Sequence, residues 1–111
     1  MGLNRVVLLR DNLEAVADVL EHALAGDVDA QFAAGMIYAE GRGVDVDLVQ
    51  AFYWLTQAIE QGDEEAGNLR LMVGADMSDE EYDRAVHLIE AARNVYIQHP
   101  AGTADAEVVL H

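Results

Sequence analysis

The sequence predicts an all-α fold, a short solenoid of about five antiparallel helices. Three observations predict it: the chain contains an internal repeat, apolar residues recur at helical spacing within each unit, and glycines stand where helices should end. With 111 residues, 52% of them apolar, the chain is long enough for one modest core.

The internal repeat consists of two echoes. The segment from Ala23 to Ala30 recurs from Ile59 to Ala66, with Gly-Asp, an acid and Ala in common, at an offset of 36 residues (62 − 26). A second echo, at an offset of 34 residues (85 − 51), relates Ala51, Leu55 and Ala58 to Ala85, Ile89 and Ala92. Two echoes with nearly equal offsets predict a repeated pair of helices.

The periodicity places the helices. We expect them at residues 11–25, 27–40, 46–61, 63–74 and 78–97, with ends placed to within about two to four residues. In the third, the apolar positions i, i+3, i+4 and i+7 hold Leu48, Ala51, Phe52 and Leu55. No segment shows sustained strand alternation. Because the connections are short, consecutive helices must pack antiparallel.

Local signals mark the helix ends. A glycine stands where each of four helices should end, as expected of left-handed C-terminal caps: Gly26, Gly41, Gly62 and Gly74. Asp27 and Asp63 can cap the helices that follow them, and two pairs have capping-box spacing, Asp47 with Gln50 and Ser78 with Glu81. Pro100 marks the end of the last helix. We therefore divide the chain into an N-terminal segment (1–10), a repeat domain (11–97) and a C-terminal tail (98–111).

A set of small, aromatic and glycine residues occupies defined positions between residues 23 and 62. Its members are Ala30, Gln31, Phe32, Gly35, Tyr38, Gly41, Gly43, Val44, Asp47, Ala51, Trp54, Ala58, Gln61 and Gly62. The set resembles the Sel-one-like repeat, a helix–loop–helix relative of the tetratricopeptide repeat. The resemblance covers roughly residues 12–93, and it implies a short right-handed α/α superhelix that binds another protein. In the last unit, Leu71 and Gly74 replace the glycine and tyrosine of the family pattern.

The repeat-defining residues also have a physical interpretation. Small side chains let neighbouring helices approach closely, and these are Ala30, Gly35, Ala51 and Ala58. Glycines permit positive φ in the turns, and these are Gly41, Gly43 and Gly62. Larger side chains supply buried area, and these are Tyr38, Val44 and Trp54.

The chain is strongly acidic, with a formal charge of 6 − 21 = −15. Such a charge repels nucleic-acid phosphates and anionic lipid headgroups, and it attracts a basic protein. The absence of cysteine excludes disulfides, thiolate metal sites and a cysteine nucleophile. The apolar run from Val6 to Leu9 is too short for a signal-peptide core or a membrane span. We therefore expect a cytoplasmic protein that binds neither nucleic acid nor membrane.

No catalytic, cofactor or metal site is predicted. The run Gly41-Arg42-Gly43 lacks the spacing, the Lys and the Ser/Thr of a phosphate-binding loop. The acidic clusters stand at helix starts, where capping and the helix dipole favour them, and none has the spacing of a calcium loop. The four histidines form no HExxH motif and lie far apart in the sequence: His22, His87, His99 and His111.

What remains is the shape of the surface. In repeat stacks, one helix of each pair lines a concave binding face, and here these are 27–40 and 63–74. The candidate partner-binding residues are Gln31, Met36, Glu40, Asn68 and Met72. Met36 and Met72 can instead fill the core, whereas Gln31 and Asn68 are polar residues on mostly apolar helices.

These inferences favour a non-enzymatic adaptor of bacterial type that binds a partner protein or peptide, with a basic partner favoured by the charge. The alternative is an inhibitor or immunity-like protein that mimics a polyanion and blocks a nucleic-acid-binding protein. A mimic needs carboxylates over one continuous face, whereas an adaptor keeps them at helix starts around a neutral groove. The stretches Val6–Leu9 and Val108–Leu110 could seal the ends of the stack or join a second copy, which leaves a homodimer open.

Overall fold

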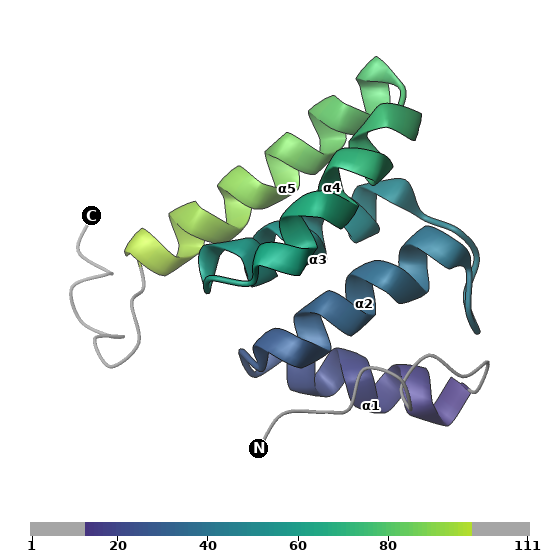
Figure 1. Cartoon of the computed structure of the whole chain (residues 1–111). Coiled ribbons are helices and arrows are strands. Elements are labelled where there is room, and N and C mark those ends of the chain that lie inside the picture. Colours follow the sequence, from purple (N-terminus) through teal and green to yellow (C-terminus); the bar gives the residue numbers. More distant parts are fainter. Residues whose placement is uncertain (1–12, 99–111) are drawn as a thin grey trace.

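Five α-helices form the structure (Figure 1), which is a computed structural model that describes residues 13–98, with side chains from Ala15 to Asn94. The helices are α1 (Leu13–Leu24), α2 (Val28–Glu40), α3 (Leu48–Glu60), α4 (Glu64–Asp76) and α5 (Asp79–Gln98). Within the described range there is no strand. Each boundary lies within two residues of the predicted one, so the prediction of an all-α, solenoid-like fold is confirmed. The segments Val6–Leu9 and Val108–Leu110, with His99 and His111, lie outside the described residues.

Side-chain caps start four of the helices. The side chains of Asp27, Asp47 and Asp63 each accept a hydrogen bond from the backbone N–H three residues later, at 3.0 to 3.2 Å. At α5 the cap is reciprocal: Ser78 Oγ accepts from the N–H of Glu81 at 3.0 Å, and a Glu81 carboxylate oxygen accepts from the N–H of Ser78 at 2.9 Å. The three Asp caps and the Ser78–Glu81 box are therefore confirmed, because these bonds satisfy donors that the helix leaves without a partner. Asp47 and Gln50 form only half of a box, since the N–H of Asp47 donates to the carbonyl of Tyr38 at 2.9 Å.

The turns use glycine at four positions, but one predicted stop is wrong. Gly26, Gly41, Gly43 and Gly62 have φ between 74° and 101°, in the region where other residues are strained. Gly74 was expected to end the fourth helix. Instead α4 continues to Asp76 and ends at Met77, whose extended backbone leads into the Ser78 cap. A helical glycine costs only about 1 kcal/mol, so the stronger cap decides where the turn lies.

The α2–α3 pair packs closely because Gly35 has no side chain. A Cβ built on Gly35 would lie 2.5 Å from Cδ2 of Leu55, well inside contact distance. Leu55 is fully buried, which stabilises the fold by about 1.5–3 kcal/mol relative to an exposed leucine. Three small residues of the repeat-defining set are fully buried beside this contact or on the same helices: Ala30, Ala51 and Ala58.

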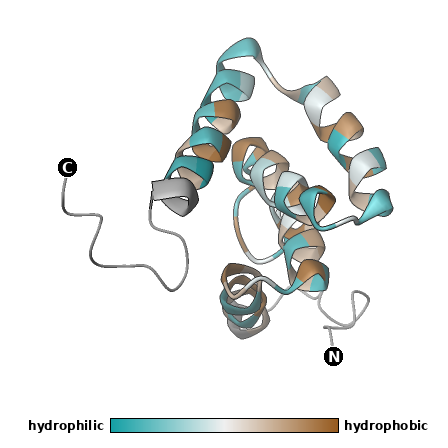
Figure 2. Ribbon diagram, turned by 90° about the vertical axis from the view of Figure 1, so that its left-hand side faces the viewer, coloured by the Kyte–Doolittle hydropathy of each residue, from teal (hydrophilic) through white to brown (hydrophobic). Residues whose placement is uncertain are grey.

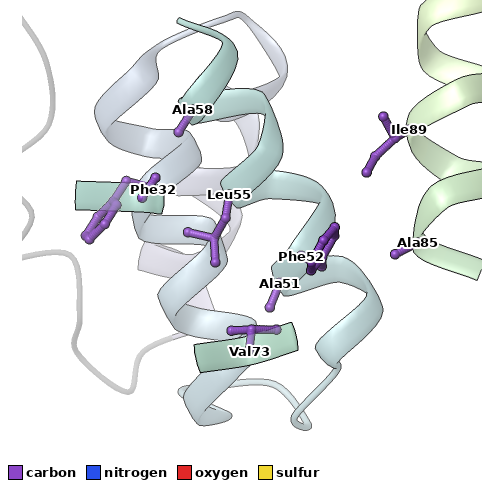
Figure 3. Close-up of a cluster of buried hydrophobic side chains, with 9 residues drawn as sticks. Phe32, Ala51, Phe52, Leu55, Ala58, Val73, Ala85 and Ile89 are labelled. Atoms are coloured by element: carbon purple, nitrogen blue, oxygen red, sulfur yellow. The ribbon is translucent and has the colours of Figure 1, made fainter. Parts of the chain in front are cut away.

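Two apolar clusters make up the core and meet at α3. The first joins α1, α2 and α3 and includes Val19, Ile37 and Trp54, with Val44 packed against it. The second joins α2, α3, α4 and α5, and its buried members are Phe32, Ala51, Phe52, Leu55, Ala58, Ala66, Val73, Ala85 and Ile89 (Figure 3). Tyr38 and Tyr53 pack against both clusters, so the core is continuous.

The last helix departs from simple sequential packing. The principal packed pairs are α1 with α2, α2 with α3, α3 with α4, and α3 with α5. The close-up in Figure 3 shows Ala85 and Ile89 of α5 on the side of α3 toward which Phe52 points. The turn from α4 into α5 is hydrophilic (Figure 2), with Asp79, Glu80 and Glu81 in the first turn of α5. Because α5 rests on α3 rather than on α4, the space between α4 and α5 stays open.

Candidate functional site

A mainly apolar stripe runs along the exposed face of α4. Asn68, Leu71, Met72 and Ala75 occupy positions i, i+3, i+4 and i+7 of this helix, and all four side chains are exposed. Leu71 is 75% exposed and Met72 is 65% exposed, so two large apolar side chains face solvent next to each other. We call these four residues the α4 stripe. Apolar side chains gathered in this way are typical of a surface that another molecule covers.

A pocket of about 580 Å³ opens beside the α4 stripe, between α3, α4 and α5. Its floor is the ring of Phe52, which makes an edge-to-face contact with Tyr82 at 5.5 Å between ring centres. Leu71 and Ala75 belong both to the stripe and to the pocket wall. The complete lining is Phe52, Thr56, Arg70, Leu71, Gly74, Ala75, Tyr82, Val86, Ile89, Glu90 and Arg93.

Arg70 is held in place at this pocket by α3. Its Nη1 donates a hydrogen bond to Thr56 Oγ1 at 3.0 Å, and Thr56 Oγ1 in turn donates to the backbone carbonyl of Phe52 at 2.8 Å. The guanidinium carbon lies 5.3 Å from the centre of the Phe52 ring, a cation–π contact. Thr56 is buried, and both Thr56 and Phe52 belong to α3, so contacts with this helix fix the position of the guanidinium.

The charges around the pocket are nearly balanced. Arg93 forms an ion pair with Glu60, at the end of α3. Glu90 is exposed and lines the same pocket. Among the described residues, Arg70 has no ion pair: its contacts are the Thr56 hydroxyl and the Phe52 ring. A chain of formal charge −15 therefore has a region here that is close to neutral.

The five candidate partner-binding residues differ in their exposure to solvent: one is buried, one is half-buried and three are exposed. Gln31 is only 6% exposed, and its amide is used inside the protein, since Nε2 donates to the carbonyl of Ala23 and Oε1 accepts from Gln61. Met36 is half-buried against the second cluster. The exposed candidates are Glu40, which forms an ion pair with Arg42 at 2.7 Å, and two members of the α4 stripe, Asn68 and Met72. The interpretation of Met72 as core filling is therefore wrong.

Metal-ligating groups do not gather in the described part of the chain. No three of its His, Asp and Glu side chains converge as metal ligands would. Burial raises the pKa of Tyr38 and of Tyr53 above 10.0, so both hydroxyls stay protonated at neutral pH. From residue 13 to residue 98, none of the helices has the length and the apolar character that a membrane span requires.

Sequence reasoning missed the pocket and half of the α4 stripe. In the sequence, Leu71 was noted only as a departure from the family pattern. Arg70 and Tyr82 were given no binding role. A signal was present in the run Leu71-Met72-Val73, because three consecutive apolar residues on a helix cannot all face the core. Val73 is the one that turns inward, at 4% exposed.

The comparisons with known proteins agree with this architecture. Residues 28–63 match the family model of the Sel1 repeat. The chain is 28% identical over 78 residues to the alginate biosynthesis protein AlgK of Azotobacter vinelandii. The aligned segment covers 70% of this chain and 17% of that protein. The chain thus spans about a sixth of the length of this curated relative. No solved structure matches the chain with significance. The matched residues contain the whole of α2 and α3 and the turn between them.

Proposed function

We propose that this chain, which carries a Sel1 repeat, is a non-enzymatic module that binds a partner protein or peptide through the concave face of its repeats, with the α4 stripe as the main contact. Sel1 repeats are in general protein–protein interaction modules. A cytoplasmic location stays a prediction from the sequence.

The observation that carries the proposal is the exposure of Leu71 and Met72 side by side on α4. Water around apolar surface is unfavourable by about 25 cal/mol per Å², so a partner that covers both side chains gains free energy. Apolar residues ringed by polar ones are typical of interface centres. Glu65 is exposed on the same helix toward its N-terminus, and exposed Asp76 ends the helix, which supplies such a polar rim.

The distribution of acids supports an adaptor over a polyanion mimic. Asp27, Asp47 and Asp63 cap helices, and Glu81 completes the cap of α5, so these four carboxylates have a local structural role. The residues of the α4 stripe are uncharged. We propose that the net charge of −15 steers a basic partner toward the chain over a distance, and that the stripe then makes the contact.

A co-purification experiment with matched variants tests the proposal. The tagged full-length chain is used as bait in three forms: wild type, a Leu71→Ser/Met72→Ser double variant, and Leu24→Ser. Leu24 is 77% exposed at the end of α1, far along the chain from the stripe, so it controls for the loss of an exposed apolar side chain. Circular dichroism confirms that all three are helical. We expect the same partner with wild type and Leu24→Ser, and its loss with the double variant.

Two other results would contradict the proposal. If the double variant retains the partner as well as wild type does, the α4 stripe is not the contact. If the recovered partners are nucleic-acid-binding proteins whose retention falls steeply with salt and does not depend on Leu71 or Met72, the polyanion mimic is the better explanation.

A further inference from the structure

The pocket beside the α4 stripe contains an arginine that the chain does not neutralise. The sequence has 21 acidic residues and only six basic ones. Elsewhere in the described part, Arg42 pairs with Glu40 and Arg93 with Glu60, whereas Arg84 is exposed on α5 and has no ion pair. Arg70 instead contacts a hydroxyl and an aromatic ring, although it is half-buried and surrounded by an acidic protein. The fold thus holds this positive charge with a hydroxyl and an aromatic ring rather than with one of its own carboxylates.

The groups around Arg70 suit a ligand with two different parts. Thr56 takes one of the five N–H groups of the guanidinium, which leaves a fork able to hold a carboxylate through two parallel hydrogen bonds. Next to it, Phe52, Leu71, Tyr82 and Val86 provide an apolar wall. A volume of about 580 Å³ is enough for one large side chain and a neighbouring carboxylate.

We propose that this pocket binds a partner segment in which an acidic residue stands next to a large apolar one. The carboxylate pairs with Arg70, and the apolar side chain packs on Phe52 and Tyr82. The inference rests on the proposed function and makes it specific, since it says which chemistry of the partner the α4 stripe and its pocket recognise. A partner can be basic as a whole and still present this local acidic segment.

A carboxylate can bind to so acidic a chain only if its attraction to Arg70 is stronger than its repulsion by the acidic side chains. At physiological salt, exposed charges further apart than about 8 Å are largely screened, so distant acids add little. One opposing group lines the same pocket, Glu90 on α5, which is exposed. A hydrogen bond to a charged group contributes about 1.5–3 kcal/mol, more than the at most about 1 kcal/mol typical of an exposed charge pair. The attraction of a bound carboxylate to Arg70 therefore exceeds its repulsion by Glu90.

A random-peptide display library is the probe that tests this proposal. Full-length wild type, Arg70→Gln and Arg84→Gln serve as baits. Arg84 is exposed on α5 and does not line this pocket, so it is the matched control for the loss of one positive charge. We expect wild type and Arg84→Gln to enrich peptides with Asp or Glu beside a large apolar residue. Arg70→Gln should enrich peptides without that acid.

Binding measurements on one enriched peptide then make the test quantitative. The peptide is compared with a version in which the corresponding amide replaces its acidic residue. In wild type the amide version should bind about ten-fold more weakly, and in Arg70→Gln the two should differ by less than about two-fold. Glu90→Gln, an exposed substitution that leaves the fold intact, should strengthen binding of the acidic peptide by about two- to three-fold.

Several outcomes would overturn the proposal. Enrichment of basic peptides, of peptides without an acid, or of none at all would show that the pocket does not select a carboxylate. So would an Arg70→Gln profile identical to that of wild type, or unchanged binding in Glu90→Gln. In these cases the co-purification with the Leu71→Ser/Met72→Ser variant still reports separately on whether the chain binds a protein through the α4 stripe.

Discussion

The side-chain amides of Gln31 and Gln61 hydrogen-bond to each other although 30 residues separate them. Gln61 Nε2 donates to Gln31 Oε1 at 2.8 Å and to the carbonyl of Gly26 at 2.9 Å. Gln31 Nε2 donates to the carbonyl of Ala23 at 3.2 Å. The pair therefore joins the end of α1, the start of α2 and the end of α3. In the part of the chain that the structure describes, no buried side-chain polar atom lacks a hydrogen bond.

Replacing Gln61 should destabilise the fold because its hydrogen-bond partner Gln31 loses a donor. Gln61→Ala leaves the buried Oε1 of Gln31 without a donor, which costs about 1–3 kcal/mol. Urea unfolding followed by circular dichroism measures the loss. Gln57→Ala, on the same helix and without such a bond, should cost no more than about 0.5 kcal/mol. Equal losses from the two variants would show that the bridge does not stabilise the fold.

Two glycines within helices should respond to alanine with opposite signs. Gly35→Ala forces a Cβ against buried Leu55, and we expect a net loss of about 1–2 kcal/mol after the gain in helix propensity. Around Gly67 nothing lies within 4 Å of an added Cβ, so Gly67→Ala should stabilise the fold by about 0.5–1 kcal/mol. Thermal melts of both variants check the signs. A stabilised Gly35→Ala would mean that α2 and α3 do not pack as closely as described.

The Ser78–Glu81 cap should support all of α5. Ser78→Ala removes the acceptor for the Glu81 N–H and should cost about 1 kcal/mol. Ser78→Asp keeps an acceptor in the same place and should be close to wild type. Because α5 packs on α3, the loss should appear as a lower melting temperature of the whole chain. A variant that frays only the start of α5 without shifting the melt would argue against this coupling.

His22 should carry its charge to a higher pH than an ordinary histidine. Its Nδ1 lies 2.8 Å from the backbone carbonyl of Asp18, and this hydrogen bond, with the charges of Asp18, Asp27 and Glu21, raises the pKa of His22 above 6.5 against partial desolvation. The stability that this contributes is complete below pH 6.5 and is lost as the pH rises through the raised pKa.

An NMR titration of His22 measures this pKa directly. Asp18→Asn should lower the pKa while leaving the carbonyl contact in place, because it removes only the carboxylate charge. His22→Gln should abolish the decline in stability just above pH 6.5. A pKa at or below 6.5 in wild type would contradict the expected direction.

The sequence predicts the helices well because their determinants are local. Apolar spacing, the Asp caps and the Ser78–Glu81 pair act within a few residues, and each works in the structure as expected. The end of α4 was wrong because a glycine only weakens a helix, while the cap that follows decides where the chain turns.

The candidate surface was harder to predict because it depends on distant partners. Gln31 was taken as an outward polar residue, but its hydrogen-bond partner Gln61 comes from the far end of α3. The orientation of α4 could not be read from its pattern, since Leu71 and Met72 face solvent while Val73 faces the core. The pocket exists only because α5 packs on α3, which no local pattern in α5 reveals.

The position of Trp54 gives the chain a built-in optical reporter. It is the only tryptophan, and it is 7% exposed in the cluster that joins α1, α2 and α3. Its ring and that of Tyr53 pack edge to face, with ring centres 5.0 Å apart. Tyr53 also packs against the second cluster. Tryptophan emission therefore senses the N-terminal half directly and the C-terminal half through one neighbouring ring. The proposed contact, the α4 stripe, does not include Trp54 or its neighbour Tyr53, so a fluorescence change on adding a partner would signal communication through the core.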